Sequence, residues 1–362
     1  MMTHNSGMAR ILSVRRYVVF AVLLVLLLAA GIGVYMRHLR IQSQGVQEFI
    51  TKYAAADDVK RVAISQEYLA KYPASQLLAS IDAKYADTLC HVQGHAIGRA
   101  IYRTNQNFSE SLQICGNACT YGCFHGVLME MFKTDSDTLG GTFEDSTSTD
   151  YLAHIQQEAK GLCSQPQVRD SVAPQACYHA LGHVFTFMTD ENLHAGVSAC
   201  DILTTPLTRQ LCVSGAFMEY MFATSSHDLV VTKDDAPCGA YPADSDECYR
   251  YKAFGWIHAW NDPVAAMNAC DRFGKNTLLC IKSIAWAQAS LHLINNDVAF
   301  SNLCGGFVGD KHAACIVGAL LRVAELNDGD NSDHACDQVT GQYHDGCIKV
   351  LHSYNSLFVG LK

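Results

Sequence analysis

The sequence predicts an all-α protein in which an N-terminal transmembrane helix precedes a disulfide-stapled solenoid of αα-hairpin repeats. Three observations support this prediction. Cysteines recur in pairs at a regular spacing, one long apolar run lies near the N-terminus, and apolar residues elsewhere recur at helical intervals. The chain has 362 residues, of which 49% are hydrophobic and 17% charged. That length and composition are sufficient to bury a sizeable core.

The paired cysteines define the repeat. The same Ala-Cys-Asp figure begins three pairs, and looser copies begin three more. In chain order the six pairs are Cys163–Cys177, Cys200–Cys212, Cys238–Cys248, Cys270–Cys280, Cys304–Cys315 and Cys336–Cys347. Counted from Cys90 and Cys123, the second cysteines follow one another at intervals of 33, 54, 35, 36, 32, 35 and 32 residues. A nearly fixed period in this range is typical of stacked helical hairpins.

Within each repeat, a short first helix ends at the first cysteine and a second helix begins at the second cysteine. Helix starts are indicated by N-cap signals at Asp190-Glu191-Asn192, at Asn261-Asp262-Pro263 and at Asn295-Asn296-Asp297. Glycines early in the second helices predict close approach between helices, because glycine otherwise weakens a helix. These glycines are Gly94, Gly126, Gly182, Gly215 and Gly318.

This unit of two helices and one cysteine pair resembles the disulfide-bridged, tetratricopeptide-like αα-repeat proteins of bacterial secretion. The resemblance covers roughly residues 87 to 360 and concerns architecture, since the Trp-Leu-Gly-Tyr consensus of tetratricopeptide repeats is absent. It implies a right-handed superhelix with a concave binding surface, and it carries over no catalytic residues.

The apolar run extends from Tyr17 to Met36 without a charged residue. Twenty residues span roughly 30 Å as a helix, which is the thickness of a bilayer core. We expect an uncleaved anchor. The alternative is a cleaved signal peptide, whose apolar region is usually shorter and closes with an Ala-x-Ala site that this run lacks. The expected regions are a cytoplasmic tail (1–16), the transmembrane anchor (17–36), a helical stem or capping hairpin (37–86) and the repeat domain (87–362).

The cysteines also predict the compartment. All sixteen lie at or after position 90, and persistent disulfides require an oxidising environment. We therefore expect a single-pass membrane protein with its N-terminus inside and its C-terminal domain in the periplasm or at the cell surface. The formal net charge of −9 argues against a nucleic-acid partner, which would need clustered basic residues.

Three cysteines that lie close together have alternative interpretations. Cys115, Cys119 and Cys123 lie four residues apart and next to His125, which could form a zinc site, although the spacing suits closed zinc sites poorly. The favoured interpretation joins Cys115 to Cys123 and Cys119 to Cys90, which leaves all sixteen cysteines paired.

One repeat is longer than the rest, and its additional residues lie at Asp135–Asp150. This segment is interpreted as a surface loop, or alternatively as a lid or an acidic ligand loop.

A histidine motif occurs twice. His91 and His95 lie four residues apart, as do His179 and His183, so each pair shares one face of a helix. The next second helix then carries Gly-x-x-Met-Glu, which ends at Glu130 in the first copy and at Glu219 in the second. His125 is present in the first copy only, where the second copy has Ser214.

Two histidines and a carboxylate form the ligand set of non-haem iron and of hydrolytic zinc, so zinc, iron and copper are the candidate ions. Three alternatives stay open at this point: the histidines are structural, they bind a metal, or they line a site for an organic ligand. Because packed helices lie about 10 Å apart, the two histidine pairs are expected in separate sites, with Glu130 beside His91 and His95 and with Glu219 beside His183.

Two functions follow as expectations. The leading one is a membrane-anchored extracytoplasmic repeat scaffold that binds another envelope or secreted protein. The alternative is a metal-dependent enzyme, an oxidoreductase or a hydrolase, with two-His-one-carboxylate sites in the first four repeats.

Overall fold

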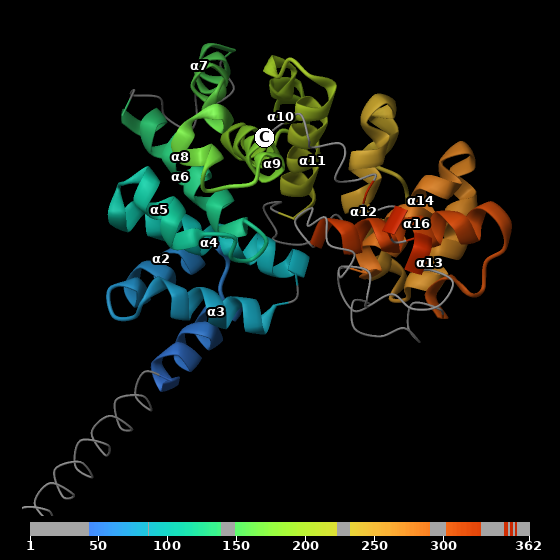
Figure 1. Ribbon diagram of the computed structural model, residues 1–362, viewed down its shortest axis with the longest axis horizontal. Coiled ribbons are helices and arrows are strands. Elements are labelled where there is room, and N and C mark those ends of the chain that lie inside the picture. The colour runs from blue at the N-terminus through green and yellow to red at the C-terminus, as the bar shows by residue number, and fades with distance from the viewer. Residues whose placement is uncertain are drawn as a thin grey trace, which may run out of the picture.

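The computed structural model is helical throughout the part of the chain that it describes (Figure 1). The described residues are 43–85, 87–138, 149–222, 232–289 and 302–326, together with 344–346, 348–349 and 352. The all-α prediction is confirmed for these residues. The predicted anchor, Tyr17–Met36, lies outside them, and none of the described helices is both long enough and apolar enough to cross a bilayer.

The described part of the region expected as a helical stem or capping hairpin comprises three helices. They are a helix over 43–54, α2 (Asp58–Leu69) and α3 (Ala74–Lys84). The Asp57 side chain caps the start of α2 by accepting a hydrogen bond from the Lys60 amide. Both α2 and α3 pack against α4, so the stem covers the outer side of the first repeat (Figure 1).

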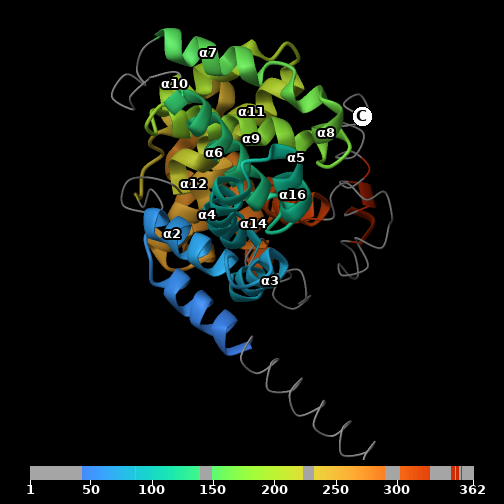
Figure 2. The ribbon, with the colours of Figure 1, turned by 90° about the vertical axis from the view of Figure 1, so that its left-hand side faces the viewer.

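The second helices of the repeats form a continuous stack, in which each packs against the next. They are α4 (Asp87–Asn105), α6 (Gly122–Thr138), α9 (Pro174–Met188), α11 (Pro206–Phe222), α12 (Ser245–Trp260), α14 (Thr277–Gln288) and α16 (Gly309–Leu326). Figure 1 shows the stack advancing from one side of the molecule to the other. In Figure 2, which is turned by 90°, α4, α6, α9 and α12 lie near the middle of the view. This arrangement is compatible with the helical-repeat architecture expected from the sequence.

The first helices are shorter and less regular than the second helices. They are α5 (Phe108–Cys115), α7 (Thr149–Ala159) with α8 (Pro166–Arg169), α10 (Leu193–Ala199) and α13 (Pro263–Ala269). Several first cysteines lie in 3₁₀ turns: η2 (Leu162–Ser164), η3 (Cys200–Ile202), η4 (Cys238–Ala240) and η6 (Cys270–Asn276). The expectation of an α-helix before every first cysteine is wrong for residues 232–244, which hold only η4 and η5 (Pro242–Asp244).

Two predicted helix starts are confirmed by their caps. The Asn192 side chain accepts a hydrogen bond from the Ala195 amide at 3.1 Å, and Asp262 accepts one from the Val264 amide at 2.8 Å. The third predicted start, at 295–297, lies outside the described residues. The predicted loop at Asp135–Asp150 is shorter than expected, because α6 continues to Thr138 and α7 begins at Thr149.

Seven disulfide bridges staple the described repeats. Their pairing is the one expected from the sequence: Cys90–Cys119, Cys115–Cys123, Cys163–Cys177, Cys200–Cys212, Cys238–Cys248, Cys270–Cys280 and Cys304–Cys315. Cys336 and Cys347 lie outside the described residues. No described cysteine is free, so the alternative zinc site at Cys115, Cys119 and Cys123 is wrong.

Glycines bring neighbouring second helices into backbone contact, as predicted. A Cβ atom on Gly182 of α9 would lie 1.8 Å from the Cys212 carbonyl oxygen of α11, and one on Gly215 of α11 would lie 1.9 Å from the His179 carbonyl oxygen. On α6, a Cβ on Gly126 would lie 2.0 Å from the His95 carbonyl oxygen. No side chain larger than hydrogen fits at these crossings.

Replacing one of these glycines away from the histidines tests this packing. We expect Gly318→Ala to lower the free energy of unfolding by about 2 kcal/mol, because a Cβ there would lie 2.0 Å from the Lys282 carbonyl oxygen and must push α14 and α16 apart. Gly306→Ala is the matched control, since a Cβ at Gly306 meets nothing within 4 Å. Urea denaturation under non-reducing conditions measures both. Equal stability of the two variants would contradict the close-packing explanation.

Candidate functional site

Five imidazole rings and one carboxylate converge in the interior from four helices. His91 and His95 come from α4, His125 from α6, His179 and His183 from α9, and Glu219 from α11. The closest ring centroids, those of His91 and His125, are 4.6 Å apart. Four of the histidines and Glu219 are buried, while His179 is partly buried.

The two histidine pairs share one site, which corrects the expectation that they lie in separate sites. The rings of His91 and His183 are 5.5 Å apart between centroids, and those of His95 and His183 are 4.8 Å apart. The physical reason is that α6 packs on both α4 and α9, and glycines bring the backbones of α4 and α6 into contact. Side chains from second helices two repeats apart therefore lie in contact.

The hydrogen bonds of His91 and His125 determine which ring nitrogens carry protons. His91 Nδ1 lies 2.9 Å from the Thr120 carbonyl oxygen, and His125 Nε2 lies 3.2 Å from the Ala176 carbonyl oxygen. A carbonyl only accepts, so both of these nitrogens donate. In the neutral rings, the remaining His91 Nε2 and His125 Nδ1 then both carry lone pairs, yet they face each other at 3.0 Å.

The Glu219 carboxyl group contacts His183 of the second histidine pair and lies near His95 of the first. Its Oε2 atom lies 2.7 Å from His183 Nδ1, and the other ring nitrogen of His183 lies 3.1 Å from His179 Nε2. The same carboxylate oxygen lies 3.6 Å from His95 Nδ1. One carboxyl group therefore lies close to histidines from both copies of the motif.

His95 presents a buried nitrogen with no acceptor or donor opposite it. Its Nε2 atom has no hydrogen-bond partner among the described residues. Leaving a buried polar atom unpaired typically costs about 1–3 kcal/mol. This nitrogen is therefore suited to a ligand that accepts a lone pair.

Burial favours neutral forms of all these groups in the absence of a cation. It lowers the pKa of His91 to about 4, against a smaller opposing effect of the bond to Thr120. Burial likewise lowers the pKa values of His95, His125, His179 and His183 well below the usual histidine range. It raises the pKa of Glu219 well above the usual carboxyl range. Burial thus works against charge on both Glu219 and His183, and a bound cation would favour the ionised form of Glu219.

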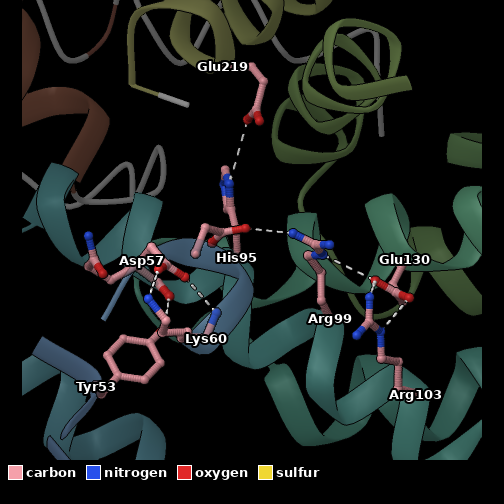
Figure 3. A network of polar contacts seen from close by, with 10 residues as sticks. Tyr53, Asp57, Lys60, His95, Arg99, Arg103, Glu130 and Glu219 are labelled. Atoms are coloured by element: carbon pink, nitrogen blue, oxygen red, sulfur yellow. Dashed lines mark hydrogen bonds and ion pairs between the residues drawn. The ribbon is translucent and has the colours of Figure 1, made fainter. Parts of the chain in front are cut away.

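Glu130 is not placed as the sequence led us to expect. Its carboxylate accepts hydrogen bonds from Arg99 Nε at 3.1 Å and from Arg103 Nε at 2.6 Å, and Arg99 also pairs with Asp58 of α2 at 2.6 Å (Figure 3). The charge of Glu130 is balanced by these two arginines. Glu130 is therefore not in the group of candidate ligands that contains His91 and His95.

The two copies of the motif have diverged at one position that decides the role of the glutamate. Arg99 follows His95 by four residues, while the equivalent position after His183 is Phe187. The Arg99 guanidinium lies over the Phe187 ring, 4.9 Å from its centroid. Glu130 thus meets arginines, whereas Glu219 meets histidines. A signal for this existed in the sequence, since His91, His95, Arg99 and Arg103 repeat every four residues along one face of α4.

Four nitrogen donors are close enough to hold one metal ion. One nitrogen each of His91, His95, His125 and His183 lies within 4.8 Å of the other three. Ligands on opposite sides of an ion are about 4.2 Å apart, twice a bond of about 2.1 Å. The rings therefore need to move inward by only a few tenths of an ångström. Comparisons of the chain with protein-family models, curated proteins and solved structures find no match.

Proposed function

We propose that this protein binds a transition-metal ion in a single histidine centre formed by His91, His95, His125 and His183. His179 stands beside the centre as a fifth imidazole, and Glu219 orients His183 from behind. This proposal replaces the two separate two-His-one-carboxylate sites expected from the sequence with one centre shared by both copies of the motif.

The facing nitrogens of His91 and His125 carry the proposal. Two lone pairs at 3.0 Å repel each other in an interior with low dielectric, and the backbone carbonyls fix both tautomers. A cation beside both nitrogens turns the repulsion into two bonds. With metal–nitrogen bonds of about 2.1 Å, a separation of 3.0 Å corresponds to an angle of about 90° at the ion, which suits five- or six-coordinate geometry.

The donor set narrows the choice of ion. Neutral imidazoles suit zinc, copper, iron and nickel, whereas magnesium and calcium prefer oxygen ligands. A histidine that binds a metal usually donates a hydrogen bond from its other ring nitrogen to a carboxylate or a carbonyl. The hydrogen bond between His183 Nδ1 and Glu219 corresponds to this arrangement. A centre of this kind supports a metal-dependent enzyme, an oxidoreductase or a hydrolase.

The proposal includes the location expected from the sequence. The bridges require an oxidising compartment, which supports a periplasmic or cell-surface domain on an anchor at Tyr17–Met36. Binding of another envelope or secreted protein, the other expected function, rests on the repeat architecture alone. The histidine centre rests in addition on converging side chains.

Metal analysis of the full-length protein tests the proposal. After purification and reloading with zinc, copper(II) or iron(II), we expect about one tightly held ion per chain, and less than a tenth of that in His95→Ala/His183→Ala. His258→Ala is the control, because His258 is exposed in the last turn of α12 and is not part of the histidine centre. A wild-type chain that retains none of these ions at stoichiometric level would overturn the proposal.

A further inference from the structure

Two histidines of the centre, and His179 beside it, bond to backbone groups that directly adjoin bridged cysteines. His91 bonds to the carbonyl of Thr120, which follows Cys119. His125 bonds to the carbonyl of Ala176, which precedes Cys177. His179 has a backbone hydrogen bond with Leu211, which precedes Cys212. Three different bridges therefore stand next to the groups that set the ring orientations.

The Cys90–Cys119 bridge restrains both partners of the hydrogen bond between His91 and Thr120. Cys90 precedes His91, and its partner Cys119 precedes Thr120, so the bridge ties the backbone of the donor to the backbone of the acceptor. The Cα atoms of the two cysteines are 5.0 Å apart. Movement of the Thr120 carbonyl away from the ring would have to carry Cys119 with it.

The loop that contains the Thr120 carbonyl has an unfavourable backbone conformation, which the bridge helps to hold. Cys119, Thr120 and Tyr121 have φ values of 51°, 53° and 67°. Left-handed backbone is unfavourable for residues other than glycine, and three in succession are held only where the surroundings over-determine them. The bridges Cys90–Cys119 and Cys115–Cys123 enclose these three residues and supply that constraint.

We propose that the bridges Cys90–Cys119 and Cys163–Cys177 are positioning groups of the metal centre, beyond their role as staples of the repeats. The inference rests on the proposed function. Through the carbonyls of Thr120 and Ala176, the two bridges aim His91 Nε2 and His125 Nδ1 at the same point. High-affinity metal binding then requires these bridges to be closed, which couples formation of the centre to oxidative folding of the domain.

The test compares three bridge deletions in the full-length protein: Cys90→Ala/Cys119→Ala, Cys163→Ala/Cys177→Ala, and the control Cys270→Ala/Cys280→Ala. The control bridge joins η6 to α14, and neither of its cysteines adjoins Thr120 or Ala176, the residues that bond to His91 and His125. The measurements are Co²⁺ affinity by competition with a chelator, the Co²⁺ absorption spectrum, and helix content by circular dichroism.

We expect each of the two site-bridge deletions to weaken Co²⁺ binding by about 10- to 100-fold and to change the spectrum, because loss of the groups that orient metal ligands has effects of this size. The control should bind like the wild type. If folded site-bridge variants match the control in affinity and spectrum, the inference is wrong. It is equally wrong if they lose their helix content, since the bridges would then be general staples. Failure of the wild type to bind Co²⁺ would instead count against the proposed function.

Discussion

Saturation of the histidine centre with its preferred ion is expected to raise the free energy of unfolding by about 4 kcal/mol when the free ion is at a thousandfold excess over the dissociation constant. The ligands come from α4, α6 and α9, so the unfolded chain cannot present them together. Binding also resolves two unfavourable features of the folded state, which are the facing nitrogens of His91 and His125 and the unpaired Nε2 of His95.

His125→Ser provides the matched variant for this prediction. Ser214 stands at the equivalent position of the second copy of the motif, so the fold accepts serine at this place in a second helix. The variant keeps the bridges and the other four histidines but lacks one ligand, and we expect it to lose most of the metal-dependent stabilisation. Urea denaturation with added ion and with chelator, under non-reducing conditions, measures the gain for each protein. An equal gain in the two proteins would indicate adventitious surface binding.

The repeat architecture was predictable because its signals are local. Cysteine spacing places each bridge across one loop, so pairs such as Cys200–Cys212 required no knowledge of the distant chain. Caps such as Asp262 act within one turn of the helix. The glycine prediction was nearly local as well, since a glycine early in a helix has few explanations other than close approach.

The shared centre was not predictable from the same signals. The distance between His91 and His183 depends on the separation of neighbouring second helices and on the rotation from one repeat to the next. The spacing of the cysteines in the sequence gives neither the separation nor the rotation. The expected distance of about 10 Å between the axes of packed helices was too large, because glycines bring the backbones into contact at several of these crossings. The separation of Glu130 from the histidines depended in part on Asp58, whose contact with Arg99 spans 41 residues.

Glu130→Ala is expected to lower the free energy of unfolding by about 3–5 kcal/mol while leaving the metal content unchanged. Glu130 is buried, and it accepts hydrogen bonds from both Arg99 and Arg103. Its removal leaves the buried Arg99 with Asp58 as its remaining ion-pair partner in this network. Breaking one side of a buried ion pair costs this much because the other charge stays in a poorly solvated place.

The double variant Arg99→Met/Glu130→Leu separates the charge effect from the loss of packing. Methionine can keep the contact that the Arg99 side chain makes over Phe187, and leucine fills the space of the carboxylate, so we expect the double variant to be more stable than Glu130→Ala alone. Urea denaturation and metal analysis on the same samples decide the role of Glu130. If Glu130→Ala loses its metal at nearly unchanged stability, Glu130 is a ligand, as the repeated Gly-x-x-Met-Glu motif suggested, and the arginine network does not define its role. If stability falls and the metal stays, the duplicated glutamates have divided their roles, with Glu130 bonded to arginines in the fold and Glu219 to histidines in the centre.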